Sequence, residues 1–128
     1  MEPIYSFPDI RDLLDRWEES YKKGLLSFWL LLLLHERPTY AFEMNARVLA
    51  LSRGTISAGE NSIYRALNRF EEIGVVSSEL QASPQGPARR YYQLTEKGSR
   101  LLRCFIERNI LLFQEEEVEK RIKEIVNE

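Results

Sequence analysis

The sequence contains few of the residues on which most catalytic and metal sites depend. It has one cysteine, Cys104, and one histidine, His35, among 128 residues. A single thiol excludes a disulfide within the chain, so a reducing cytoplasm is the expected setting. One histidine without clustered cysteines does not form a metal-ligand set. A glycine-rich phosphate loop is also absent, so the sequence supports no enzyme, no metal site and no cofactor.

Apolar runs in the sequence are too short to cross a membrane. The longest, residues 25–34, has about half of the roughly 20 residues that a spanning helix requires. The N-terminus does not carry a signal-peptide pattern. With 44% hydrophobic and 30% charged residues, the composition is that of a soluble globular domain with extensions. We therefore expect a cytoplasmic protein in which residues 25–35 form a central buried helix, and in which Cys104 packs in an apolar helical stripe.

Acidic residues are concentrated near the two ends of the chain. The net charge is −2, but residues 22–103 carry twelve Lys and Arg against seven Asp and Glu, a net +5. Residues 1–21 have a net charge of −4, and residues 104–128 a net charge of −3. A basic central segment suits a polyanion such as nucleic acid, and we expect the acidic ends to lie on the far side from it.

Residues 61–73 have the spacing of an amphipathic helix. Apolar side chains recur every three or four residues from Ile63 onward, and polar and basic ones lie between them. Asn61 or Ser62 is suited to cap the start of this helix, because its side chain accepts from backbone N–H groups. Gly74 is suited to end it in a left-handed conformation.

Two strand-like stretches follow, residues 75–81 and 89–94, and a loop rich in turn-forming residues separates them. Thr95 then begins another helix. A helix with a basic face followed by a hairpin with a basic strand is the layout of a winged helix-turn-helix. The helix would enter the major groove of DNA, and the wing, residues 75–95, would follow the phosphates. An ordinary solvated face explains either element alone, but the combination favours DNA. The residues expected to contact DNA are Arg47, Arg53, Asn61, Ser62, Tyr64, Arg65, Asn68, Arg69, Arg89, Arg90 and Tyr92.

Three short motifs run through this segment. They are Ser62-Ile63-Tyr64-x-Ala66-Leu67, Arg69-Phe70-Glu71-Glu72-x-Gly74 and Arg90-x-Tyr92-x-Leu94-Thr95-x-x-Gly98. With these motifs, residues 23–103 resemble the PadR family of transcriptional regulators. Arg65 departs from the pattern, because the family usually has proline at this position. The resemblance implies a mainly helical α+β fold and a sequence-specific regulator of double-stranded DNA, expected to be a repressor on a palindromic operator.

The chain divides into three expected segments. Residues 1–23 form an N-terminal amphipathic helix, residues 24–98 the winged helix-turn-helix, and residues 99–128 a long C-terminal dimerisation helix. We expect Ser6 to cap the first helix and Gly24 to separate it from the next one. The first helix cannot be stable alone in water. It covers the core of its own subunit or packs on a partner's C-terminal helix, and the sequence leaves both possibilities open.

The helix expected over residues 61–73 is the one that would enter the major groove, and we call it the recognition helix. Between the central helix and this recognition helix, we expect Thr39 to cap a helix over residues 40–51. Residues 55–57 are β-like and would pair beside the wing. The side chains expected to join the core from this helix are Phe42, Met44, Ala46, Val48, Leu49 and Leu51.

The C-terminal stripe is longer than a small core can cover. A homodimer seam is the favoured explanation, and packing within one chain is the alternative. The residues expected at this seam are Leu102, Phe105, Ile106, Phe113, Val118 and Ile122.

Two further readings stay open. Some members of the family that the chain resembles bind planar aromatic compounds near the dimer interface. In this chain the residues that could line such a site are Trp17, Trp29, Phe105 and Phe113, although aromatic residues at helical spacing are more often core. The alternative function is a winged-helix protein-interaction module without specific DNA binding. The aligned basic face argues against this alternative, because a protein-interaction module does not need one.

Overall fold

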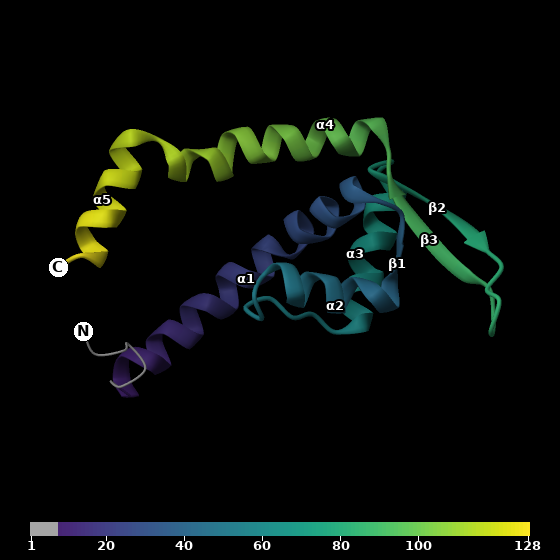
Figure 1. Ribbon diagram of the computed structural model, residues 1–128, viewed down its shortest axis with the longest axis horizontal. Coiled ribbons are helices and arrows are strands. Elements are labelled where there is room, and N and C mark those ends of the chain that lie inside the picture. Colours follow the sequence, from purple (N-terminus) through teal and green to yellow (C-terminus); the bar gives the residue numbers. More distant parts are fainter. Residues whose placement is uncertain (1–7) are drawn as a thin grey trace.

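The computed structural model describes residues 8–128 as a mainly helical chain with one small sheet (Figure 1). The elements in chain order are α1 (Pro8–Glu36), β1 (Thr39–Tyr40), α2 (Ala41–Leu51), α3 (Glu60–Glu72), β2 (Val76–Gln81), β3 (Arg89–Leu94), α4 (Glu96–Phe105), a π-helix (Ile106–Ile110), a 3₁₀ turn (Leu111–Gln114) and α5 (Glu116–Val126). The predicted α+β winged helix-turn-helix class is confirmed.

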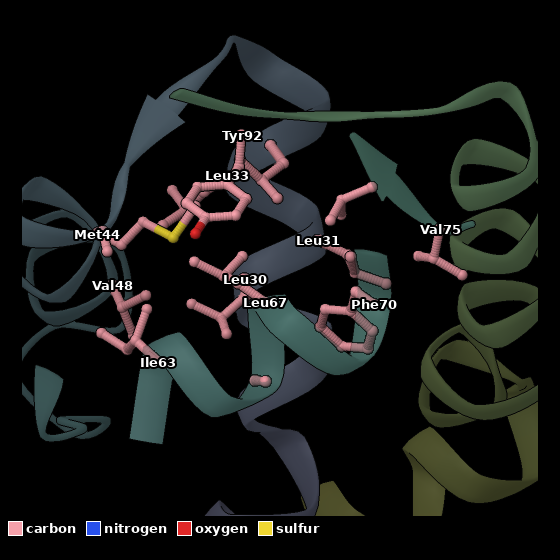
Figure 2. Close-up of a cluster of buried hydrophobic side chains, with 14 of the residues drawn as sticks. Leu30, Leu31, Leu33, Met44, Val48, Ile63, Leu67, Phe70, Val75 and Tyr92 are labelled. Carbon is pink, nitrogen blue, oxygen red and sulfur yellow. The ribbon is translucent and has the colours of Figure 1, made fainter. Parts of the chain in front are cut away.

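The core gathers between the second half of α1 and the α2–α3 pair, with the sheet closing one side (Figure 2). As predicted, the leucine-rich run is central: Leu30, Leu33 and Leu34 are almost fully buried. Met44 of α2 and Leu67 of α3 meet them and are inaccessible to solvent. Burying an aliphatic side chain of this size stabilises the fold by about 1.5–3 kcal/mol, so this cluster holds α3 in place.

The predicted helix break at Gly24 is wrong, because α1 continues through it. A glycine inside a helix costs about 1 kcal/mol relative to alanine. That is less than one buried leucine in the following turns contributes. The first half of α1 is exposed, with Leu13 60% and Trp17 75% accessible. The expected cap at Ser6 lies outside the described residues.

The sheet is antiparallel with strand order β1-β3-β2. Its third strand comes from Thr39 and Tyr40, which pair with Tyr92 and Tyr91, and not from residues 55–57 as expected. Within 55–57, Ile56 turns into the core and is 4% exposed. Its backbone N–H donates to Ser52 Oγ over 3.0 Å, which holds it in a turn away from the sheet.

The start and the core face of α2 also differ from the sequence prediction. Its N-cap position is Tyr40, while the Thr39 hydroxyl donates to the Arg37 carbonyl over 3.1 Å. Thr39 is therefore a buried strand residue and not a helix cap. The buried side chains of α2 are Ala41, Met44 and Val48. The predicted core residues Phe42, Ala46, Leu49 and Leu51 are exposed.

The C-terminal region is not the single long helix that was predicted. Thr95 caps α4 as expected, accepting at Oγ1 from the Gly98 N–H over 3.1 Å. The helix then passes through the π-helix and the 3₁₀ turn and breaks at Glu115, whose ψ of 137° is extended. Figure 1 shows α5 turning sharply away from α4 after this break. Cys104 is exposed near the end of α4 and does not pack as expected.

The two ends of the molecule carry different parts of the chain. Along the long axis in Figure 1, the β2–β3 hairpin lies at one end, and α5 and the first turns of α1 lie toward the other. Within residues 8–128, the acidic helix α5 and the first turns of α1 therefore lie far from the wing.

Candidate nucleic-acid interface

Helix α3 presents a polar face opposite its buried one. Ile63 and Leu67 are inaccessible in the core. The opposite face exposes Arg65, Asn68 and Arg69 to solvent. Packing against α1 and α2 fixes the axis of this helix, so its basic face is held outward on a rigid support.

The helix begins one residue earlier than predicted. Gly59 occupies the N-cap position, so the expected caps Asn61 and Ser62 lie inside the first turn. Ser62 Oγ instead accepts from Arg65 Nη2 over 3.3 Å. The expected end is confirmed, because Gly74 follows the helix with a φ of +80°.

The wing places its two neighbouring arginines on opposite faces. Side chains alternate along a strand, so Arg89 shares a face with Tyr91, and Arg90 shares the other with buried Tyr92. On the outer face, Arg89 Cζ lies 4.5 Å from the centroid of the Tyr40 ring. The Tyr40 and Tyr91 rings meet edge to face with centroids 5.4 Å apart. This aromatic contact ties β1 to the wing.

On the inner face, Arg90 belongs to a chain of hydrogen bonds that reaches α3. Arg90 Nη1 donates to Ser78 Oγ over 3.0 Å, and the Ser78 hydroxyl donates to Glu71 Oε2 over 2.7 Å. The sequence reasoning missed Glu71 and Ser78. Strand alternation places Ser78 on the same face as Arg90, but it does not indicate the hydrogen bond between them or the approach of Glu71 from α3.

The structure places the Tyr92 side chain in the core, which corrects its inclusion among the predicted surface contacts. Its side chain is 3% exposed, and it packs in the cluster with Leu33 and Met44 (Figure 2). Burial raises the pKa of Tyr92, and the nearby Glu71 carboxylate raises it further. Tyr64, in contrast, is 40% exposed on α3.

Two other predicted contacts lie around α2. Arg47 Nη2 donates to Glu36 Oε2 over 2.7 Å, and Arg47 Nη1 donates to the Thr39 hydroxyl. These bonds tie α2 to the end of α1 and to β1, so Arg47 has a structural role in the protomer. Arg53 is exposed just after α2, with a positive φ of 56°.

The predicted dimer residues divide into two groups. Leu102 is 5% exposed and belongs to the core of its own chain, which corrects its assignment to the seam. Ile106 packs against the same core, and the Phe105 ring stacks on Phe28 at 5.7 Å. Beyond them, Phe113 and Ile122 are 52% and 43% exposed. Val118 is partly buried, as Phe105 and Ile106 are, so Phe113 and Ile122 are the most exposed of the six predicted seam residues.

The aromatic residues considered for an effector do not enclose a common cavity within the protomer. Trp17 is three-quarters exposed and Phe113 is half exposed, so neither lines an enclosed space. Trp29 packs edge to face on Phe28 with ring centroids 5.6 Å apart.

Across residues 8–128, no helix is long and apolar enough to cross a membrane. The same residues bring together no group of three or more His, Cys, Asp and Glu side chains suited to a metal ion.

The α2–α3 pair, the hairpin and the short strand β1 define a winged helix-turn-helix protein. Residues 30–104 match the family described as transcriptional regulator PadR-like. This match spans more than half of the chain, and the chain therefore belongs to the PadR-like family of transcriptional regulators. Membership in a family of regulators confirms the expectation that the chain is not an enzyme.

Solved structures of similar proteins have the same fold. A PadR family regulator from Eggerthella lenta is 24% identical with a TM-score of 0.71, and the match covers 91% of this chain and 97% of that chain. A PadR-like transcription factor from Bacteroides fragilis is 30% identical with a TM-score of 0.57, covering 86% and 98%. Bacillus subtilis PadR, solved in complex with operator DNA, is 18% identical with a TM-score of 0.59, covering 64% and 47%. Among curated proteins, none matches.

Proposed function

We propose that this protein is a sequence-specific regulator of double-stranded DNA that inserts α3 into the major groove and lays the β2–β3 hairpin along the phosphates. The observation that carries the proposal is the exposed basic face of α3, held on a rigid core beside a wing with two arginines. The Bacillus subtilis relative in complex with operator DNA supports it. In this proposal residues 24–98 form the DNA-binding unit.

The exposed side chains divide into reading and anchoring groups. Arg65 can form two hydrogen bonds with a guanine and Asn68 two with an adenine, which are pairings that discriminate between bases. Arg69, Arg89 and Arg90 anchor the protein on phosphates, which carry most of the affinity but no sequence information. We also assign the remaining predicted contacts to the anchoring group: Asn61, Tyr64 and Arg53, which are exposed, and Ser62 and Arg47, which are partly buried and hydrogen-bonded within the protomer.

We further propose a homodimer that acts as a repressor on a palindromic operator. Exposed apolar side chains on the first half of α1 and on the region after residue 110 support the dimer, because water disfavours so large an apolar surface on a small chain. These side chains include Leu13, Trp17, Phe113 and Ile122, and the partly buried Val118 lies on the same helix as Ile122. A two-fold dimer presents two copies of α3, and the half-sites that they read are then related by the same two-fold symmetry.

The proposed planar aromatic effector would bind only where two protomers close around the aromatic side chains. The exposure of Trp17 and Phe113 in one protomer supports a shared site over one within a single chain. Calorimetric titration of the dimer with a set of planar aromatic compounds tests this part separately from DNA binding.

The decisive experiment is a selection of bound duplexes from a random pool with the wild-type protein. We expect an enriched palindromic motif, and we expect a gel shift of that motif to survive an excess of scrambled competitor. Enrichment of a motif without palindromy would contradict the dimeric arrangement. A pool without any enriched motif would contradict sequence-specific DNA binding and favour the protein-interaction module.

A further inference from the structure

Three side chains from three elements form a continuous hydrogen-bonded chain between the recognition helix and the wing. Glu71 lies in the last turn of α3, Ser78 in the middle of β2 and Arg90 in β3. The Ser78 hydroxyl donates to Glu71 Oε2 over 2.7 Å and accepts from Arg90 Nη1 over 3.0 Å. The Ser78 hydroxyl therefore bridges Arg90 of the wing and Glu71 of α3.

The strand register explains why Arg90 reaches Ser78. In the ladder, Leu80 is directly opposite Arg90, and Ser78 is opposite Tyr92. The Arg90 side chain thus leans one pair back from its own position, toward the base of the hairpin. At the base, Gly74 reverses the chain immediately after α3, so Glu71 and Ser78 approach one another across a short turn. The guanidinium is consequently held in the corner between the helix and the wing.

We propose that Ser78, anchored by Glu71, is a positioning residue that holds Arg90 for a phosphate lying in the corner between α3 and the wing. The inference rests on the proposed DNA-binding function. An arginine has five N–H donors, and the bond to Ser78 uses one of them. The others are available to a phosphate, because the Arg90 side chain is exposed. Holding a long side chain in its bound position reduces the conformational entropy that is lost on binding.

The neighbouring arginine has a different support. Arg89 lies on the opposite face of β3, with its guanidinium over the Tyr40 ring. Two adjacent residues of the same type are therefore directed to different places, and only Arg90 is connected to the recognition helix. Glu71 adds a negative charge beside the proposed DNA surface. Such a charge repels phosphates, so Glu71 would weaken DNA binding if it had no other role. Its hydrogen bond to Ser78, and through Ser78 to Arg90, supplies that role.

The first test compares Ser78→Ala with Ser77→Ala. Ser77 is the adjacent residue of the same type on the outer face, where it accepts from Gln93 Nε2 over 3.3 Å. Neither substitution changes the charge of the protein. Fluorescence anisotropy with a labelled duplex of the selected motif should show a loss of affinity of about three- to tenfold for Ser78→Ala, the range expected for one hydrogen bond. Ser77→Ala should remain within about twofold of wild type.

A double-mutant cycle then asks whether Ser78 acts through Arg90. If it does, Ser78→Ala causes no further loss in a protein that already carries Arg90→Ala. An equal loss with and without Arg90, or wild-type affinity for Ser78→Ala, overturns the inference. In either case the proposed function stands, because wild type still binds the selected duplex in preference to a scrambled one. Failure of wild type to show that preference removes the proposed function itself and the inference with it.

Two substitutions of the exposed Glu71 separate positioning from electrostatics without disturbing the core. Glu71→Gln keeps an acceptor for the Ser78 hydroxyl and removes the charge, so it should bind the duplex at least as tightly as wild type. Glu71→Ala removes the charge and the acceptor, and should bind about three- to tenfold more weakly than Glu71→Gln. Equal affinities for the two variants overturn the role of Glu71 as an anchor. Circular dichroism and thermal unfolding verify that each variant is folded.

Discussion

Two glycines lie inside helices of this protein, and their surroundings are opposite. A Cβ added to Gly98 in α4 would lie 2.1 Å from the Val75 carbonyl oxygen and 2.7 Å from Leu94 Cδ1. For Gly24 in α1, no atom of the described residues outside its own helix backbone and chain neighbours comes within 4 Å of the added Cβ. Gly98 is therefore required by the close approach of α4 to the start of the wing, whereas Gly24 only weakens its helix.

Gly98→Ala should lower the free energy of unfolding by at least about 1–3 kcal/mol, because the added methyl group meets backbone and the helix must move. Gly24→Ala should raise it by about 0.5–1 kcal/mol, since alanine has the better helix propensity. Urea unfolding followed by circular dichroism measures both. A tolerated Gly98→Ala would mean that α4 does not approach Val75 as closely as the structure has it.

The buried Tyr92 gives a prediction for alkaline pH. Burial raises its pKa in the folded state above about 10, the value in an unfolded chain. Ionisation therefore favours the unfolded chain. The contribution of neutral Tyr92 to the free energy of unfolding is intact below about pH 10 and is lost as the pH rises through the folded-state pKa. Tyr92→Phe lacks the ionisable group.

We expect the Tyr92→Phe variant to lose less stability than wild type between neutral and strongly alkaline pH, as measured by thermal unfolding across a pH series. Tyr64→Phe is the control, because Tyr64 is 40% exposed. At neutral pH, Tyr92→Phe should also bind DNA as wild type does. Weaker DNA binding by Tyr92→Phe at neutral pH would indicate that the Tyr92 hydroxyl contacts DNA after all.

Among the elements, those set by local sequence were predictable and those set by tertiary contacts were not. The bounds of β3 and the capping of α4 by Thr95 follow from alternation and capping chemistry, and both were predicted correctly. Strand β1 has two residues and exists only because Thr39 and Tyr40 pair with β3. So short a strand has no periodicity to detect.

The candidate site shows the same limit. The polar face of α3 could be read from helical spacing, because packing of its apolar face fixes the other face outward. The hydrogen bonds of Arg90 and Arg47 could not be predicted from helical spacing, because their partners Ser78 and Glu36 lie twelve and eleven residues away along the chain. The continuity of α1 through Gly24 depends likewise on how many leucines the fold buries beyond it.

The helix and the wing should fail in different ways when they are altered. Arg65→Ala, on α3, should weaken binding to the selected motif by about 1–3 kcal/mol and binding to scrambled DNA much less. Arg90→Ala, on the wing, should weaken both nearly alike and reduce the slope of log affinity against log salt by about one. Titrations of both duplexes at two salt concentrations measure these effects. If Arg90→Ala alone abolished the preference for the selected motif over scrambled DNA, Arg90 would be the base-reading residue and Arg65 the phosphate anchor.

At the scale of the whole molecule, the break at Glu115 marks where the chain can be shortened to test the proposed dimer. Removing residues 104–128 would take away Phe105 and Ile106, which pack in the same chain. Removing residues 115–128 takes away α5, whose residues are largely exposed in the protomer, and leaves the core intact.

The chain shortened after residue 114 should therefore fold but form monomers, or dimers that dissociate at a higher protein concentration than wild type. Sedimentation velocity over a concentration series measures this. Substituting Ile122→Glu in the full chain is the matching test, because the side chain is 43% exposed and the change leaves the core alone. A dimer of unchanged affinity in both variants would exclude α5 from the interface.

The separation of the acidic ends from the basic centre also gives each protomer an electric dipole moment. Its negative pole lies toward α5 and the start of α1, and its positive pole lies toward the wing. In the field of a polyanion such a molecule experiences a torque and arrives with the wing leading, which increases the fraction of productive collisions. In a two-fold symmetric pair, the components across the axis cancel and those along it add. This orientation increases the association rate constant. The increase becomes smaller as added salt shortens the screening length, which is about 10 Å at 0.1 M.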